Sequence, residues 1–385
     1  MTTTVDWRAL REEFPTLRET AYLNTCSLGL LSNPSRQAVN RYLDLWASYG
    51  AAAWYDHWMA QLTTLRQQFS RLVGCEETEV AIVPNVSSGL AAISSSLDFS
   101  KRNRVVTTEL DFPTVAHHFL AQEDKGVETV IVPSKDRINV DSRALEEAIN
   151  DKTALVATSR VFFTSGQIQD VAFLAGLCHR NGALLLVDDY QGTGQLPIDV
   201  KATGIDVLLS GGLKWLLGGP GIAYMYVREE LIQSLTPTIT GWFAHRDQFD
   251  FNLSYMAFKE DARRFEAGTP SVAAVYAGEA GLSLVNQVGP EAIRQRTSEL
   301  TVDLVSRLGE AGFELQIPAT PESHASITLL KSSEPHAVVK ELSKRSIIVD
   351  ARSGGVRISP YFYNSTEDNQ RLVEALREIA KESQI

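Results

Sequence analysis

The sequence predicts an α/β protein with a large domain built on a mostly parallel β-sheet, covered by helices on both faces, and a smaller C-terminal α+β domain. Between residues 79 and 227, short apolar segments alternate with helical segments, which is typical of a parallel sheet buried on both sides. After about residue 275, short strands mix with helices. The 385 residues suffice for two domains. We predict a large domain over 25–275 and a small domain formed by 1–24 and 276–385.

The segment before the sheet is predicted to be mainly helical. Residues 7–14 have the spacing of a short amphipathic helix that ends at Pro15, and residues 34–72 contain two further helical stretches. Between them, the loop at 22–29 is rich in Gly, Ser and Asn. Its Asn24 side chain can bind a polar ligand, although such a loop is more often only a turn.

Seven apolar segments are the predicted strands of the large domain: 79–84, 104–108, 128–133, 154–159, 183–188, 206–210 and 222–227. Helices are expected at 85–97, after Pro113, at 141–149 with Asp141 as N-cap, and at 171–181. The small domain should contain strands at 325–330, 346–349 and 356–359 and helices at 336–345 and 366–382. Ligands are expected at the carboxyl ends of the parallel strands.

Composition excludes several functional classes. The net charge of −11 argues against nucleic acid and anionic membrane surfaces as partners. Cys26, Cys75 and Cys178 form no CxxC pair, so neither a metal site nor a disulfide framework is predicted. The first residues show no signal-peptide pattern and no apolar run is long enough to span a membrane. These features indicate a cytoplasmic protein in a reducing compartment.

The stretch DVLLSGGLKWLLGGPG, at residues 206–221, contains a candidate reactive lysine. An apolar strand runs into Ser210 and two glycines, and Lys214 follows before a second glycine turn. A lysine held in such a turn after a buried strand can be desolvated, which lowers its pKa and frees its amine to attack carbonyl groups. The alternative is a surface lysine in a Gly-rich loop.

Two further strand ends carry polar groups. Asp188 ends the most apolar strand, where burial without a positive partner is costly, and Gln191 can reach the same space. The alternative is an exposed Asp188 that caps the strand. At NVSSG, residues 85–89, a helix begins directly after a strand, so its free N–H groups and the hydroxyls of Ser87 and Ser88 can hold a phosphate. The alternative there is a plain N-cap, and no Walker A or GxGxxG motif is present.

Together these three features match the three groups of pyridoxal phosphate. Its aldehyde needs an amine, its pyridinium nitrogen needs a carboxylate, and its phosphate needs a helix N-terminus. The chain resembles the fold-type I pyridoxal-phosphate enzymes of the class V aminotransferase family, which includes cysteine desulfurases, selenocysteine lyases, kynureninases and isopenicillin-N-epimerase-like proteins. The resemblance runs from YLNTCSLG (22–29) to VRISPYFYN (356–364) and is strongest at VDDYQ (187–191), SGGLKWLLGGPG (210–221) and RRFEAGTP (263–270).

The resemblance implies a role for each matching cofactor residue. Lys214 would form the Schiff base with the cofactor and move the Cα proton, and Asp188 would pair with the pyridinium nitrogen. Gln191 would bond the phenolic oxygen, and Phe112 would stack on the ring. The implied phosphate ligands are Val86, Ser87, Ser88 and either Ser210 or Gly211, with the spacing of Ser210 to the lysine one residue off.

The resemblance also implies partners. Thr269 would reach the phosphate of a neighbouring subunit, which predicts a homodimer with shared active sites. Arg357 would hold the α-carboxylate of a small amino-acid-type substrate, as its planar fork suits a carboxylate. Asn24 and Trp242 are further candidates for substrate contact. Trp242 lies in a Gly-Trp loop like that of the epimerase-like members, with packing in a hydrophobic core as its alternative.

Two departures from the family pattern bear on the reaction. No cysteine lies in VDARSGGVRIS (349–359), so a desulfurase that forms a persulfide on its own cysteine is not expected. Phe163 and Arg160 replace the family's usual Asn and His. We therefore predict a pyridoxal-phosphate lyase that acts by β-elimination, possibly with C–S cleavage. Alternatives are an aminotransferase, an amino-acid epimerase or, in another class, a non-catalytic cofactor-binding relative.

Overall fold

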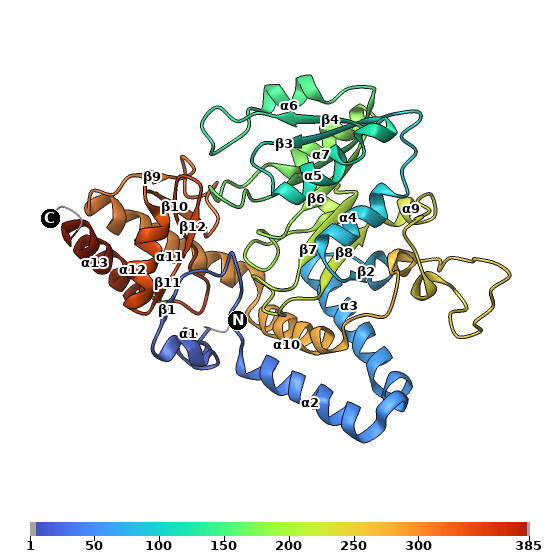
Figure 1. Ribbon diagram of the computed structural model, residues 1–385, viewed down its shortest axis with the longest axis horizontal. Helices are drawn as coiled ribbons and strands as arrows, with labels where there is room; N and C mark the ends of the chain where they lie inside the picture. The colour runs from blue at the N-terminus through green and yellow to red at the C-terminus, as the bar shows by residue number, and fades with distance from the viewer. Residues whose placement is uncertain (1–4, 383–385) are drawn as a thin grey trace.

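The structure, a computed structural model, describes residues 5–382. Figure 1 shows a larger body around the strands β2–β8 and a smaller one with helices α11–α13. The larger body contains the predicted sheet, and the smaller contains the predicted C-terminal strands and helices. The predicted α/β class is confirmed.

The sheet of the large domain has the strand order β2-β8-β7-β6-β5-β3-β4. Neighbours from β7 to β4 are parallel, whereas β8 runs antiparallel to both β2 and β7. The carboxyl ends of β2, β3, β5, β6 and β7 therefore share one edge. The strands are β2 (Val80–Val83), β3 (Arg104–Thr108), β4 (Glu128–Val132), β5 (Thr153–Ser159), β6 (Leu184–Asp188), β7 (Val207–Gly211) and β8 (Ala223–Val227).

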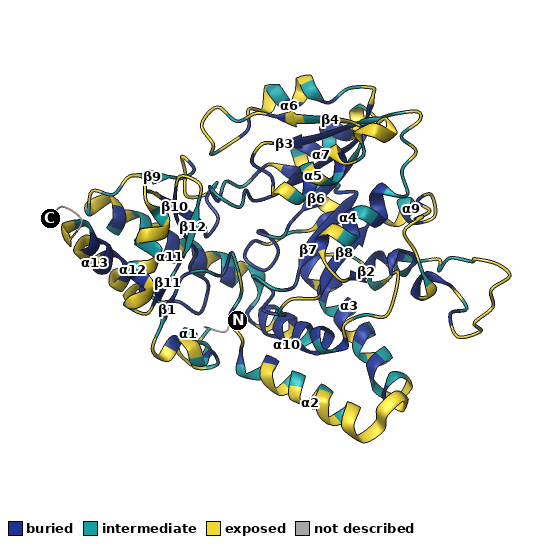
Figure 2. Ribbon diagram, in the orientation of Figure 1, coloured by how far each residue is buried: buried dark blue, intermediate teal, exposed yellow. Residues whose placement is uncertain are grey.

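Helices cover both faces of this sheet because side chains along each strand alternate between the faces. Leu209 of β7 packs with residues of α4 (Val86–Ser94) and α5 (Pro113–Leu120), while Leu208 packs with residues of α3 (Met59–Val73) and α7 (Val171–Arg180). The central strands are buried, as Figure 2 shows. The shorter helices α6 (Ser142–Ala148), α8 (Val200–Thr203) and α9 (Glu229–Ile232) complete this domain.

Two long helices link the domains and were not predicted from the sequence. Helix α10 (Val272–Val288) packs on α2 (Asn33–Tyr49) and α3, and α11 (Pro290–Glu310) follows after Gly289. Most residues of α10 are buried, so it lacks the one-sided apolar stripe by which a helix is recognised. The predicted boundary at residue 275 stays a prediction, and it falls inside α10.

The small domain contains an antiparallel sheet in the order β12-β13-β10-β9. Strand β1 (Ala21–Tyr22) pairs in parallel with β11 (Ile347–Ile348), and Arg11 of α1 (Trp7–Glu12) lies 2.7 Å from Asp368 of α13, so the N-terminal segment contacts this domain. No helix within residues 5–382 has the length and apolarity needed to cross a bilayer. The remaining elements are β9 (Leu315–Gln316), β10 (Thr328–Lys331), β12 (Asp350–Arg352), β13 (Gly355–Ile358), α12 (Pro335–Lys344) and α13 (Thr366–Glu382).

Candidate active site

A cavity of about 280 Å³ lies where the carboxyl ends of β5, β6 and β7 meet the first residues of α4 and α5. Its position follows from the sheet, because parallel strands place their carboxyl ends at one edge. Its lining residues run in the sequence from Ser27 to Lys214. Six residues predicted from the sequence are among them: Val86, Ser87, Phe112, Asp188, Gln191 and Lys214.

Lys214 lies in the turn after β7, and its amine is held between two aromatic rings. Its Nζ is 4.1 Å from the ring centroid of Tyr190 and 5.8 Å from that of Phe112. No ion pair of Lys214 with an acidic side chain is found among residues 5–382. Burial lowers the pKa of Lys214 to about 8. A larger share of the amine is thus uncharged near neutral pH than for an exposed lysine, as a nucleophile requires.

Asp188, at the end of β6, is buried with only 4% of its surface exposed. One carboxylate oxygen accepts a hydrogen bond from the Tyr190 backbone N–H at 3.1 Å. Burial raises the pKa of Asp188 to about 6. Among residues 5–382 no basic side chain forms an ion pair with Asp188: Lys214 is near enough only to offset part of the rise in its pKa, and Arg160 bonds Asp189 twice at 2.8 Å. A buried carboxylate on the cavity wall that forms no ion pair with the nearby Lys214 fits a protonated ring nitrogen.

The N-terminus of α4 forms another part of the wall. Asn85 caps this helix and accepts hydrogen bonds from the N–H of Ser88 at 2.8 Å and from its hydroxyl at 3.1 Å. Ser88 therefore serves the cap and does not line the cavity, which differs from its predicted role. Val86 and Ser87 do line the cavity. As residues of the first helical turn, their N–H groups have no acceptor within the helix and remain suited to a phosphate.

Ser210 does not line the cavity, and its predicted contact with the phosphate stays a prediction. It is a buried residue of β7 that alternates with Leu209, so its side chain points to the sheet face opposite α4. Its Oγ has no hydrogen-bond partner among the described residues. Gly211 follows on the cavity side, but a Cβ there would lie closer than 3.0 Å to the Tyr190 ring. Tyr190, which was missed from the sequence, therefore fills that space.

Gln191 lines the cavity with its side-chain amide already bonded to protein groups. Its Oε1 accepts a hydrogen bond from the indole N–H of Trp215 at 2.8 Å, and its Nε2 donates to the Cys26 carbonyl at 3.0 Å. These bonds fix the amide orientation and leave one N–H of Nε2 for a ligand. A bond from Gln191 to the phenolic oxygen stays a prediction.

Phe112 is presented to the cavity by a turn that a buried aspartate stabilises. Asp111 accepts hydrogen bonds from the N–H of Thr108 at 2.9 Å and from the N–H of Ser159 at 2.6 Å, which joins β3 to β5 below Phe112. Phe112 meets Phe163 edge-on, with centroids 5.4 Å apart. Nothing local in the sequence predicts these contacts, since β3 and β5 lie about 50 residues apart.

Arg357 and Asn24 do not line the cavity but lie behind its wall. The fully buried guanidinium of Arg357 donates to the Phe163 carbonyl at 2.8 Å and to Ser27 Oγ at 2.7 Å. Both Phe163 and Ser27 line the cavity, so Arg357 is one residue removed from it. Asn24 forms a bridge with Ser359, and its backbone carbonyl accepts from the Ser27 N–H.

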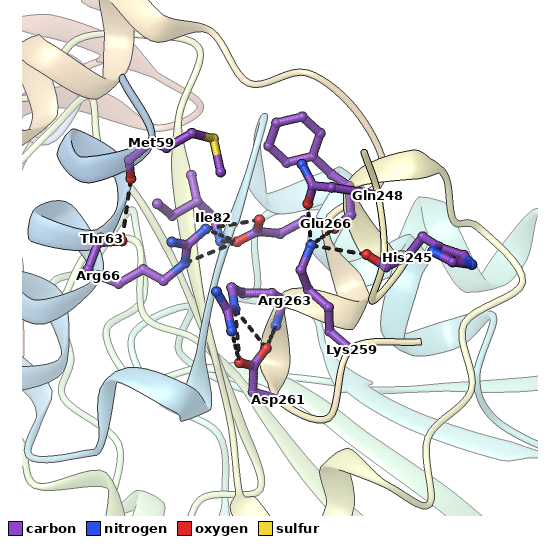
Figure 3. A network of polar contacts seen from close by, with 11 residues as sticks. Met59, Thr63, Arg66, Ile82, His245, Gln248, Lys259, Asp261, Arg263 and Glu266 are labelled. Atoms are coloured by element: carbon purple, nitrogen blue, oxygen red, sulfur yellow. Dashed lines mark hydrogen bonds and ion pairs between the residues drawn. The ribbon is translucent and has the colours of Figure 1, made fainter. Parts of the chain in front are cut away.

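Trp242 and Thr269 lie outside the cavity, on the lobe formed by residues 242–269. A polar network around Lys259, shown in Figure 3, holds this lobe. Lys259 Nζ donates to the carbonyls of Phe243 at 2.7 Å and His245 at 3.2 Å, which holds the segment containing Trp242. Trp242 is 40% exposed, so the predicted alternative of core packing is not what the structure shows. Thr269 is exposed, which leaves it free to face another subunit.

Glu266 anchors the RRFEAGTP motif to the large domain (Figure 3). It lies 2.8 Å from Arg66 Nη2 and accepts from the Ile82 N–H at 2.9 Å, so one carboxylate joins α3 to β2. Both charged side chains are 6% exposed. Such a buried pair is costly to break because the remaining charge is left without a partner.

Comparison with known proteins gives consistent matches over nearly the whole chain. The family model described as Aminotransferase class-V matches residues 37–372. An uncharacterized aminotransferase, YcbU of Bacillus subtilis (strain 168), is 35% identical over 366 residues, covering 95% of this chain and 96% of the relative. A kynureninase of Bacillus anthracis is 26% identical over 390 residues, covering 97% and 91%. The cystine C–S lyase C-DES, solved with its product cysteine persulfide, has a TM-score of 0.88 at 21% identity, covering 95% and 99%, a likeness of fold.

Proposed function

The chain belongs to the class-V aminotransferase family and is a pyridoxal-phosphate-dependent enzyme, and from this premise we propose that it is a lyase that removes a β-substituent from an amino acid without a cysteine nucleophile. The observation that carries the proposal is a lone amine, Lys214, on the wall of a small cavity that no thiol lines. Cys26 is buried outside that lining, although its thiol lies close enough to Lys214 to influence the pKa of the amine, and Cys75 and Cys178 do not line the cavity. The structural likeness to a C–S lyase supports the lyase proposal, as an analogy at the level of the fold.

The residues of the cavity fit the cofactor by charge and shape. When bound, pyridoxal phosphate supplies an aldehyde for the substrate's amine and a ring that accepts the electron pair released at Cα. The buried Asp188 carboxylate keeps a proton on the ring nitrogen, which maintains the electron-accepting form. The first turn of α4, at Val86 and Ser87, would hold the phosphate, and Phe112 would cover the ring.

Lys214 performs the proton transfers. With cofactor and substrate bound, the Lys214 amine would be positioned to remove the Cα proton, and its lowered pKa suits a general base near neutral pH. The electron pair left at Cα then expels the group on Cβ. The wall contributed by Phe112, Phe163 and Leu213 is apolar, which favours a small apolar or sulfur-containing side chain.

A second candidate is an aminotransferase, supported by the name of the 35% identical relative. In that reaction Lys214 returns the same proton to the cofactor instead of allowing the Cβ group to leave. The residues described above serve both outcomes, because both begin with loss of the Cα proton.

A homodimer with shared active sites belongs to the proposal. Thr269 is exposed and does not line the cavity of its own chain, although its motif matches the family's phosphate-contacting segment. Apolar side chains stand out on the same lobe, with Leu253 99% exposed and Phe251 70% exposed. Such a patch on a polar surface favours contact with another protein surface. Light scattering coupled to gel filtration should give twice the mass of the chain, and a monomer that binds cofactor and turns over would contradict the shared site.

The reaction is tested with purified holoenzyme and a panel of amino acids. L-cysteine, L-cystine and L-alanine are each incubated with and without a keto-acid acceptor, and pyruvate, ammonia and sulfide are measured. The lyase predicts pyruvate and ammonia from the sulfur-containing substrates without an acceptor, and none from the Lys214→Ala variant. Turnover that depends strictly on the keto acid would instead establish the aminotransferase.

A further inference from the structure

A cluster of charged groups lies directly behind the cavity wall, where β12 and β13 meet the loop at 22–29. Asp350 and Arg357 are opposite each other across these antiparallel strands, and Arg352 lies on the same face of β12 as Asp350. The Oδ2 atom of Asp350 is 2.6 Å from Arg352, 2.7 Å from Ser27 Oγ and 3.1 Å from Arg357. One oxygen atom thus accepts from three donors, and its place is fixed by the strand register.

The guanidinium of Arg357 is only partly satisfied by these contacts. Nη1 donates to the Phe163 carbonyl, and Nη2 donates to Ser27 and Asp350. Nε is buried without a hydrogen-bond partner among the described residues, and the side chain is 1% exposed. A buried N–H without an acceptor is unfavourable. The Nε–H of Arg357 can therefore gain a hydrogen bond to a ligand that supplies an acceptor.

The position of the cluster connects it to the cavity. Ser27 and Phe163 line the cavity and also bond Arg357, so a carboxylate that passes between them meets the guanidinium. Burial alone would raise the pKa of Asp350, but the bond from Ser27 and the two arginines hold it below its ordinary value. Asp350 is therefore an anion at neutral pH and already occupies Nη2, the donor that a bidentate carboxylate would share with Nε.

We propose that Asp350 is a specificity-determining residue, because its carboxylate is the resident counter-ion that a substrate's carboxylate must displace from Arg357. The two arginines and one aspartate leave a single uncompensated positive charge, which matches one substrate carboxylate and disfavours a second. The inference rests on the proposed function, in that an amino-acid substrate is taken to meet Arg357. It goes beyond that function by assigning selectivity to a side chain that never touches the cofactor.

The test compares two amines that differ by a carboxylate. Glycine and methylamine are titrated into the holoenzyme while the visible absorbance of the lysine-bound cofactor is followed. In Asp350→Asn the apparent Kd for glycine should fall at least tenfold and that for methylamine should stay within twofold, because only glycine competes with the removed charge. L-aspartate should gain still more than glycine. Glu314→Gln, which removes a charge from an exposed ion pair with Lys331 in the same domain, should change neither.

The outcomes separate the inference from the function on which it rests. An unchanged or raised Kd for glycine in a folded Asp350→Asn variant would overturn the inference, since Asp350 would then only orient Arg357. Asp350→Ala, compared by circular dichroism and the same titration, gives a second reading if the asparagine variant is unstable. A wild-type spectrum that responds to neither amine would refute the proposed function, and the inference with it.

Discussion

Replacing Gly211 by alanine should disturb the cofactor site through Tyr190. Gly211 lies in β7 with no left-handed backbone conformation, so alanine meets no backbone strain there. On backbone entropy alone the change should stabilise the fold by about 0.4–1 kcal/mol. The added Cβ, however, would lie closer than 3.0 Å to two ring atoms and the hydroxyl oxygen of Tyr190, a separation that real Cβ atoms do not show. Overpacking of this kind costs about 1–3 kcal/mol, so the net effect should be destabilising.

The same change should weaken cofactor binding, because the Tyr190 ring that must move lies 4.1 Å from the Lys214 amine. Thermal unfolding of the apoenzyme and the Kd of pyridoxal phosphate, measured by absorbance, are the two readouts. Tyr190→Ala combined with Gly211→Ala should recover much of the lost stability, since the clash is then gone. Gly309→Ala is the control, as a Cβ there has no neighbour within 4 Å. A Gly211→Ala protein with wild-type Tm and wild-type Kd would refute the reasoning.

Three further predictions concern charge. Asp188→Asn should abolish turnover and raise the stability of the apoenzyme at pH 8 by about 2–3 kcal/mol. The reason is that the pKa of Asp188 is raised to about 6 in the folded protein, so its ionised carboxylate destabilises the fold above that pH. The gain in Tm should vanish below the unfolded pKa, near pH 4, where the carboxyl is protonated in both states. The rate at which apoenzyme captures pyridoxal phosphate should rise with pH and level off above about pH 8, as the Lys214 amine loses its proton, and a pH-independent rate would contradict the lowered pKa. Glu266→Ala should destabilise the protein by about 3–5 kcal/mol in urea unfolding, because the buried Arg66 loses its partner; a loss below about 1 kcal/mol would show that water replaces it.

The sequence could identify the residues that sit at strand ends. Lys214, Asp188 and Ser87 each follow an apolar strand directly, and parallel strands bring their ends together whatever the details of packing. Ser210 lies on the sheet face opposite α4, because a shift of one residue along a strand moves a side chain to the other face, and its predicted contact with the phosphate stays a prediction. Its neighbour Gly211 lies on the face toward α4, against the side chain of Tyr190.

Contacts between distant segments could not be predicted in this way. The bond from Ser159 to Asp111 depends on the pairing of β3 with β5, and the placement of Tyr190 against Gly211 depends on that of β6 with β7. The contact of Asp350 with Ser27 joins segments 323 residues apart. Contacts of this kind form only when distant segments pack together, so no local sequence pattern predicts them.

The central claim, that Lys214 is the residue to which the cofactor is joined, is tested most directly by borohydride reduction of the holoenzyme followed by peptide mass spectrometry. We predict loss of the visible absorbance band and a cofactor-sized mass increase on the peptide that contains Lys214, with no label in Lys214→Ala. A label on another lysine, such as Lys259, or a protein that takes up no cofactor at all, would contradict the account.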